Sequence, residues 1–145
     1  MPDIQRVEIV PYTPAEMYDL VNDIKNYPEF IPWCNHTDVL KQDEDEIQAT
    51  LHFEGAGFTK SFTTHNRLQK NKMVEIRLIN GPFKHMEGFW RFDVDGDNGC
   101  KIMLDLEFEL AGGLLSLAFG PIFHQVANTL VDAFSKRAKE VYGER

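Results

Sequence analysis

Apolar and polar residues alternate along the middle of the chain, from about residue 35 to residue 110. Successive side chains of a β-strand point to opposite faces, so this alternation is typical of strands with one buried face. Short connections join antiparallel neighbours, so the pattern predicts about six consecutive strands in one antiparallel sheet. Turn-forming sequences separate these strands near residues 43–45, 55–57, 71, 80–82 and 95–99.

The hydrophobic period changes after Gly112-Gly113, which ends the predicted sheet. From Leu114 onward, apolar residues recur every three or four positions, which predicts a long amphipathic C-terminal helix. Gly120-Pro121 predicts a kink in this helix, or a separate short helix before it. A sheet with one apolar face needs a cover, and this helix is the only predicted element long enough to cross it. We therefore expect the sheet to curve around the C-terminal helix.

The N-terminal part adds a strand and a helix. Residues 4–10 are rich in β-branched residues, and Thr13-Pro14-Ala15-Glu16 has the pattern of a capping box that starts a helix. Prolines at positions 28 and 32 argue against a regular helix or central strand. We expect a short helical turn and a rigid loop there, with Phe30 and Trp33 pointing inward. The predicted fold is one α+β domain over residues 1–145, in the order β-α-α-β6-α with about seven strands.

The charge balance disfavours nucleic-acid binding as a general role. The formal net charge is −8 and the isoelectric point is about 5.0, so contact with phosphate backbones is disfavoured and no DNA partner is expected. Two cysteines, Cys34 and Cys100, form no CxxC pair, which suits a reducing cytosol. The N-terminus lacks a signal-peptide pattern, and no apolar stretch reaches the ~18 residues of a membrane span. We expect a cytoplasmic protein without a membrane span.

The sequence contains no motif that predicts catalysis or metal binding. The histidines form no HxxxH spacing, and His52 and His65 occupy polar, outward positions, so no metal site is predicted. There is no GxSxG motif, and Cys34 is interpreted as a small buried hydrophobic residue. Carboxylates at positions 105, 107 and 109 fit a solvated strand face better than an acid–base pair. We therefore expect a binding protein without catalytic residues, and not an enzyme.

Six segments, spread in order over nearly the whole chain, carry a family resemblance. On these segments the chain resembles the START-like, or helix-grip, superfamily. It resembles more closely the RatA family of ribosome-association toxins and its coenzyme Q-binding START-domain relatives. The resemblance implies a START-like helix-grip fold. The segments are YTPAEMYDLVND at 12–23, YPEFIPWC at 27–34, KSFTT at 60–64, NGPFK at 80–84, GFWRF at 88–92, and AF with RAKEVY between 133 and 142.

The resemblance implies two functions. RatA-type members bind the large ribosomal subunit and inhibit subunit association, which blocks translation initiation, and this is the leading interpretation. In the alternative, the chain binds ubiquinone (coenzyme Q) or another polyprenyl lipid in an apolar cavity and supports cellular respiration. Neither function requires a cofactor. A polyketide-cyclase-like enzyme is the least favoured class, because no acid–base constellation faces the predicted cavity.

Aromatic residues are numerous, and the simplest interpretation is that most of them fill the core. A sheet wrapped around one helix also leaves volume that side chains do not all fill, which favours an apolar ligand cavity. Residues 114–121 are the predicted mouth of that cavity. The predicted ligand-binding residues are Phe30, Trp33, Phe53, Phe62, Trp90, Phe92, Phe108, Leu115, Phe119 and Phe123.

Ribosome binding requires cations that reach RNA phosphates or ribosomal proteins. The predicted partner-binding residues are Lys84, Arg91, Arg137 and Lys139. Arg137 and Lys139 belong to the family-like segment at the end of the C-terminal helix. A structural role is an open alternative for these two, because the helix dipole favours cations near a C-terminus by about 0.3–1 kcal/mol. The expected partners are the large ribosomal subunit and a hydrophobic small molecule.

Overall fold

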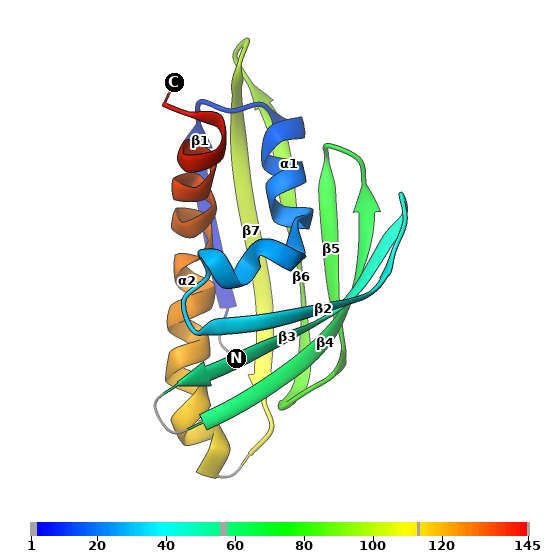
Figure 1. The fold of residues 1–145 in the computed structure, drawn as a ribbon, viewed down its shortest axis with the longest axis vertical. Coiled ribbons are helices and arrows are strands. Elements are labelled where there is room, and N and C mark those ends of the chain that lie inside the picture. Colours follow the sequence, from blue (N-terminus) through cyan, green and yellow to red (C-terminus); the bar gives the residue numbers. More distant parts are fainter. Residues whose placement is uncertain (1–2, 56–57, 113, 145) are drawn as a thin grey trace.

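A computed structural model describes residues 3–55, 58–112 and 114–144; the side chains of residues 55, 58 and 114–119 lie outside this description. The elements follow the predicted order β-α-α-β6-α, with a 3-10 helix, η1, as the second helical segment (Figure 1). The helices are α1 (Pro14–Asn22), η1 (Ile24–Glu29) and α2 (Leu114–Tyr142). The strands are β1 (Asp3–Val10), β2 (Cys34–Gln42), β3 (Glu46–Gly55), β4 (Phe58–Gln69), β5 (Met73–Asn80), β6 (Phe83–Asp95) and β7 (Gly99–Leu110).

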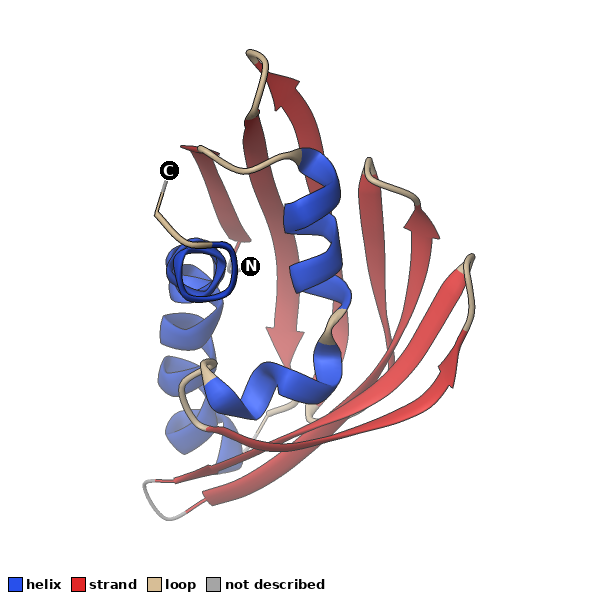
Figure 2. Cartoon of the chain, turned by 45° about the horizontal axis from the view of Figure 1, so that its top comes forward, coloured by secondary structure: helices blue, strands red, loops and turns tan. Residues whose placement is uncertain are grey.

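The strands form one antiparallel sheet of seven strands in the order β1-β7-β6-β5-β4-β3-β2, so β1 and β2 are its edges. Figure 2 shows the sheet bending around α1, η1 and α2. Helix α2 packs against β1, β7 and α1, while η1 packs against β2. The predicted curved sheet around the C-terminal helix is confirmed. Helix α2 continues through Pro121, so the separate short helix that the sequence allowed before this proline is not formed.

The bend of the sheet coincides with interruptions in the strand pairing. The register shifts twice in β2, after Cys34 and after Val39, once in β5 between Leu78 and Asn80, and once in β6 after Phe83. Irregularities of the β-bulge type bend the strand that carries them and increase its local twist. These shifts therefore help a sheet of seven strands to curve around the helices.

Gly88 marks a close approach between two central strands. It lies in β6, opposite Leu106 of β7. A Cβ atom at this position would lie 2.2 Å from the carbonyl oxygen of Asp105 and 2.8 Å from the Cα atom of Leu106. Both are backbone atoms of β7, which cannot rotate away as the end of a flexible side chain can. Glycine is therefore required here, as is usual where one backbone comes very close to another.

The start of α1 and the end of α2 are tied together. The predicted capping box is confirmed, because the backbone N–H of Glu16 donates to Thr13 Oγ1 at 3.2 Å and the backbone N–H of Thr13 donates to Glu16 Oε1 at 2.9 Å. The hydroxyl of Tyr142 donates to the carbonyl oxygen of Glu16 at 2.9 Å, and that of Tyr12 donates to the carbonyl oxygen of Gly143 at 2.8 Å. These bonds fix the C-terminal end of α2 against the first helix.

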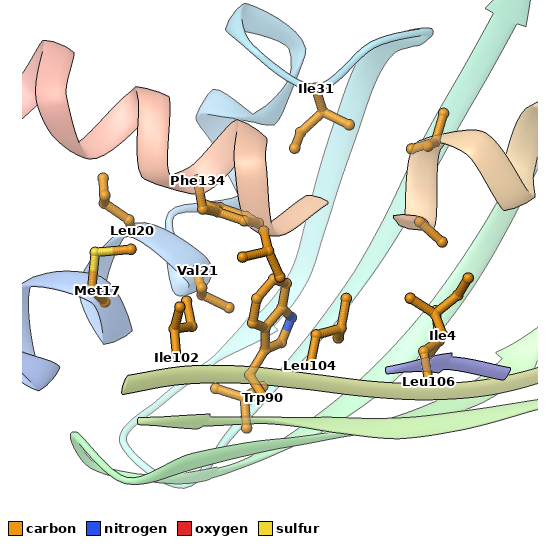
Figure 3. Close-up of a cluster of buried hydrophobic side chains, with 14 of the residues drawn as sticks. Ile4, Met17, Leu20, Val21, Ile31, Trp90, Ile102, Leu104, Leu106 and Phe134 are labelled. Atoms are coloured by element: carbon orange, nitrogen blue, oxygen red, sulfur yellow. The ribbon is translucent and has the colours of Figure 1, made fainter. Parts of the chain in front are cut away.

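The core fills the space between the sheet and the helices (Figure 3). At its centre, Phe134 of α2 is only 1% exposed and stands edge-on to Trp90 of β6, with ring centroids 5.2 Å apart. Tyr27 of η1 and the adjacent Phe30 contact the same ring, at centroid distances of 5.5 Å and 5.3 Å. A single aromatic cluster therefore joins α2, the sheet and η1.

Both cysteines lie in this core as free thiols. Burial raises the pKa of Cys34 to about 11, and burial also raises the pKa of Cys100 to about 11. A thiol with such a pKa stays protonated at neutral pH, whereas the thiolate is the reactive form. The interpretation of Cys34 as a small buried hydrophobic residue is confirmed.

Candidate functional site

A cavity of about 90 Å³ lies inside the curve of the sheet, between strands β3–β7, the η1 region and α2. Its surface is apolar or aromatic except where Thr64 brings a hydroxyl and Asn66 an amide. Such a lining suits a ligand that is mostly hydrocarbon, with one or two polar groups to orient it. The lining residues are Val21, Ile24, Tyr27, Ile31, Leu51, Phe53, Phe62, Thr64, Asn66, Val74, Ile76, Met86, Trp90, Leu106, Phe123, Val126, Ala127, Leu130 and Phe134.

Four of the predicted ligand-binding residues lie in this lining, namely Phe53, Phe62, Trp90 and Phe123. Phe53 and Phe62 project from neighbouring strands and stack, with ring centroids 5.6 Å apart and 9° between the ring planes. Phe123 of α2 stands edge-on to Phe62, at a centroid distance of 5.8 Å. The structure therefore brings these rings together from β3, β4 and α2 around one cavity.

Other predicted ring residues do not line the cavity. Phe92 packs against Tyr18 of α1 at a centroid distance of 5.8 Å, and Phe108 packs against Phe123 at 4.9 Å. Phe30 belongs to the aromatic cluster around Phe134. For these three residues the simpler interpretation, that aromatic residues fill the core, describes the structure. The side chains of Leu115 and Phe119, like those of all residues 114–119 of the predicted mouth at 114–121, lie outside the described residues.

The prediction that Trp33 points inward is wrong. This residue is 40% exposed and adopts a left-handed backbone conformation with φ of 68°. It immediately precedes β2, and its carbonyl oxygen accepts a hydrogen bond from the backbone N–H of Glu54 at 3.0 Å. The next residue, Cys34, is buried at 4% exposure. The left-handed turn at Trp33 directs its side chain outward just before β2 begins with the buried Cys34.

Asn66 is a cavity residue that was not predicted. It is 8% exposed, and its Oδ1 atom has no hydrogen-bond partner among the described residues. The alternation of inward and outward side chains along β4 could have predicted this position. Every second residue faces inward, and Phe62, Thr64 and Asn66 all line the cavity. A buried polar atom without a partner is costly, so this amide oxygen is a place where a ligand donor or a water would be favoured.

The size of the cavity limits what it can hold as it stands. An apolar protein cavity of about 150 Å³ accommodates benzene, whereas this one measures about 90 Å³. A quinone ring with a polyprenyl tail is much larger than benzene. Entry of such a lipid would therefore require side chains or helix α2 to move outward.

The predicted partner-binding cations do not form one patch. Lys84 pairs with Glu109 at 3.4 Å and Arg91 with Asp93 at 3.1 Å. The two cations are seven residue positions apart along β6, or roughly 23 Å. On α2, Lys139 pairs with Glu144 at 3.2 Å.

Arg137 has a mainly structural environment. Its Nη2 atom lies 3.3 Å from Oε2 of Glu29, and its guanidinium lies 5.1 Å from the centroid of the Phe30 ring. The side chain is only 20% exposed. A cation stacked on a ring and paired with a carboxylate holds η1 against α2, which is a structural role other than the helix-dipole interaction considered from the sequence.

A groove of about 750 Å³ opens between the start of α1, the β4–β5 turn and β6. Its cationic residues are Lys70, Lys72 and Arg91, and its carboxylate is Asp93. Arg91 pairs with Asp93, whereas Lys70 and Lys72 form no salt bridge with a residue that the structure describes, and Lys70 interacts through charge with Asp19. The groove therefore carries a net positive charge on a protein whose overall charge is −8.

Comparison with known proteins identifies the family. The model of the family described as polyketide cyclase / dehydrase and lipid transport matches residues 10–135. A protein of Pseudomonas aeruginosa named ribosome association toxin RatA is 46% identical over 97% of this chain and 97% of its own length. The mitochondrial coenzyme Q-binding protein COQ10 homolog B of Xenopus laevis is 28% identical, over 95% of this chain and 58% of its own length.

Solved structures agree on the fold. A START superfamily protein from Mycobacterium smegmatis superposes with a TM-score of 0.73, covering 96% of this chain and 98% of that one at 19% identity. The ZhuI aromatase/cyclase from Streptomyces sp. R1128 gives a TM-score of 0.69 over 98% of this chain and 88% of its own, at 18% identity. The chain belongs to the START-like polyketide cyclase, dehydrase and lipid transport family and, within it, to the RatA-type members. None of the described helices is both long and apolar enough to cross a membrane.

Proposed function

We propose that this protein binds the large ribosomal subunit and hinders its association with the small subunit, which limits translation initiation in the cytoplasm. The observation that carries the proposal is the likeness, at 46% identity over nearly the full length of both chains, to a protein named ribosome association toxin RatA. The protein acts by binding and not as an enzyme. In support, the described cavity lining contains no carboxylate, histidine or cysteine to serve as acid, base or nucleophile.

Sedimentation through a sucrose gradient tests the proposal. The purified protein is mixed with isolated large subunits, isolated small subunits, or both, at low salt. We expect the protein to move with the large subunit and to reduce the peak of joined ribosomes when both subunits are present. A protein that stays at the top of the gradient with large subunits, or leaves the joined peak unchanged, would overturn the proposal.

The groove at the start of α1 is the surface that we propose for contact with ribosomal RNA. Lys70 and Lys72 are exposed and make no salt bridge with a described residue, and Lys70 interacts through charge with Asp19. Their amines are therefore accessible to RNA phosphates. Release of counterions from the RNA then favours binding. The negative charge elsewhere on the protein restricts such contact to this groove.

Charge reversal in the groove gives the first prediction. The double variant Lys70→Glu with Lys72→Glu is expected to bind large subunits at least about tenfold more weakly, with a salt dependence reduced by roughly two phosphate contacts. The control is Lys101→Glu with Lys136→Glu, which makes the same change in net charge at two exposed positions outside the groove. Equal loss of binding in both variants would show that overall charge, and not this groove, controls the interaction.

A second candidate function is the binding of ubiquinone or a related polyprenyl lipid in the cavity. It is favoured by the apolar lining and by the likeness to a protein named as coenzyme Q-binding. Native mass spectrometry of protein purified from its own host, followed by quinone titration, tests this candidate. The absence of both a co-purifying lipid and quinone binding would rule it out.

Filling the cavity gives the second prediction. Ala127 is 1% exposed and projects from α2 into the cavity, so Ala127→Leu places a larger side chain where the lipid would lie. We expect quinone affinity to fall at least about tenfold, because the lost contacts exceed about 1.4 kcal/mol. Gln125→Leu, two residues away on the exposed side of α2, is the matched control and should leave the affinity unchanged. Ribosome binding should survive in both variants, which separates the two functions.

A further inference from the structure

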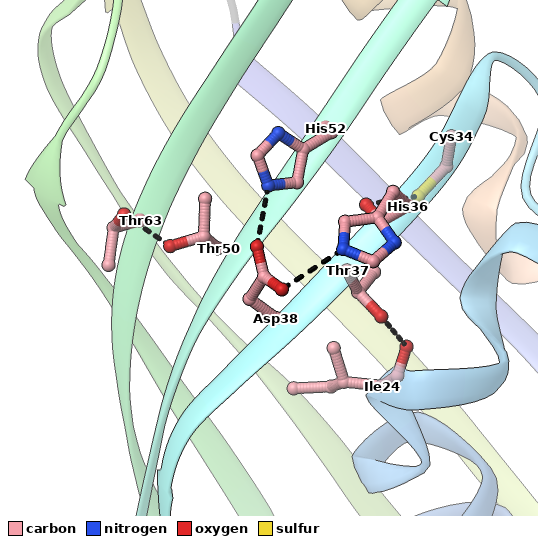
Figure 4. A network of polar contacts seen from close by, with 8 residues as sticks. All are labelled: Ile24, Cys34, His36, Thr37, Asp38, Thr50, His52 and Thr63. Carbon is pink, nitrogen blue, oxygen red and sulfur yellow. Dashed lines mark hydrogen bonds and ion pairs between the residues drawn. The ribbon is translucent and has the colours of Figure 1, made fainter.

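Three side chains with metal-binding atoms meet on the outer face of the sheet (Figure 4). Nε2 of His36 lies 3.0 Å from Oδ1 of Asp38, and Nε2 of His52 lies 2.9 Å from Oδ2 of the same carboxylate. One ligand atom from each residue lies within 4.8 Å of the other two. Neither the proposed ribosome contact nor the cavity uses this cluster.

Strand geometry creates the cluster. His36 of β2 is paired directly with His52 of β3, so their side chains leave the same face of the sheet side by side, with ring centroids 5.3 Å apart. Asp38 follows His36 by two residues and therefore returns to that face. The intervening Thr37 points the other way, and its hydroxyl donates to the carbonyl oxygen of Ile24 in η1 at 3.0 Å. Ligands on paired strands are held more rigidly than ligands on loops.

We propose that His36, Asp38 and His52 form a binding site for a divalent transition metal of the zinc type. Two imidazole nitrogens and one carboxylate oxygen make a ligand set that suits Zn²⁺ and its first-row neighbours, whereas Mg²⁺ and Ca²⁺ prefer oxygen ligands alone.

The observed spacing fits this ligand set. In a tetrahedral zinc site with bonds of about 2.0–2.1 Å, neighbouring ligand atoms are roughly 3.3 Å apart. Each imidazole nitrogen lies close to this distance from one oxygen of Asp38, at 3.0 Å for Oδ1 and 2.9 Å for Oδ2, and one ligand atom from each residue lies within 4.8 Å of the others. A metal bound through a single carboxylate oxygen therefore requires one of the two rings to shift. Coordination by both Nε2 atoms places the ring protons on Nδ1, so metal binding changes the tautomer of each histidine.

The electrostatics of the cluster also favour a cation. The carboxylate of Asp38 lies between the two imidazole rings and supplies a negative charge to the cluster. The protein as a whole has a net charge of −8. The side chains of His36 and Asp38 are 62% and 49% exposed, so the metal would keep positions open to solvent. Those open positions can accept water or a ligand atom from a binding partner.

Zinc titration of the purified full chain tests the site and gives the third prediction. Calorimetry should show one Zn²⁺ bound per chain, and the single variants His36→Gln, His52→Gln and Asp38→Asn should each bind at least about tenfold more weakly. The matched control is His85→Gln. His85 is likewise a partly exposed strand histidine paired with a carboxylate, Glu107 at 3.4 Å, but it lies outside the cluster.

Nuclear magnetic resonance of the histidine rings provides a second readout that is independent of affinity. Sub-stoichiometric Zn²⁺ should shift the His36 and His52 ring signals into the Nδ1–H tautomer and leave His85 unchanged. Circular dichroism confirms that each variant is folded. The proposal is overturned if the unaltered chain binds no zinc, if His85→Gln loses as much affinity as His36→Gln, or if the ring signals of the cluster do not respond.

Discussion

Replacing Phe134 with alanine is expected to lower the free energy of unfolding by about 3–5 kcal/mol. The ring is 1% exposed and contacts Trp90, Tyr27 and Phe30 at centroid distances of 5.2–5.5 Å. Its removal eliminates buried apolar surface and leaves a hole next to the existing cavity. Because the ring connects α2, the sheet and η1, little of that hole can be closed by a local shift.

Urea denaturation followed by tryptophan fluorescence measures this loss. The control is Val141→Ala on the same helix, where the side chain is 50% exposed and the effect should stay within roughly 0.5 kcal/mol. A Phe134→Ala variant that unfolds at the same urea concentration as Val141→Ala would show that the aromatic cluster does not stabilise the fold.

Gly88→Ala is expected to destabilise the protein by more than about 3 kcal/mol, the upper range for adding a methyl group to a packed core. The added Cβ would lie 2.2 Å from the carbonyl oxygen of Asp105 and 2.8 Å from Leu106 Cα, so the backbones of β6 and β7 would have to separate. These strands pair along almost their full length, which spreads the disturbance over many hydrogen bonds.

Gly112→Ala is the control for this substitution. A Cβ atom at Gly112 meets nothing within 4 Å among the described atoms, and its backbone is not in the positive-φ region that disfavours other residues. The thermal unfolding midpoint of the Gly112→Ala variant should therefore match that of the unaltered protein. Equal midpoints for Gly88→Ala and Gly112→Ala would mean that β6 and β7 can separate at little cost, contrary to this prediction.

The fold was predictable from sequence because its main features depend on local patterns. The period of two gave the strands, the turn residues gave their antiparallel order, and the period of 3.6 after Gly113 gave the covering helix. Thr13 and Glu16 marked the start of α1, because their capping hydrogen bond joins residues only three positions apart in the sequence. The need for glycine at position 88 was not predicted, because it depends on the distance to a strand far away in sequence.

The candidate site was predictable only in part, for the same physical reason. Alternation assigned Phe53 and Phe62 to the inward face, but it did not separate rings that line the cavity from rings that fill the core. The orientation of Trp33 depended on a left-handed turn that the two preceding prolines, at positions 28 and 32, did not specify. The His36–Asp38–His52 cluster arises from pairing between two strands, so no spacing along one segment could predict it.

The two register shifts in β2 have a consequence for the edge of the sheet. An edge strand presents unpaired N–H and C=O groups, which can serve as a template for a strand of another molecule. Leu40 is 61% exposed on β2 and would favour such stacking. The interruptions after Cys34 and Val39 break the regular spacing of those groups, and Lys41 places a charge beside the second one. The irregularities that accompany the bend therefore also protect this edge against aggregation.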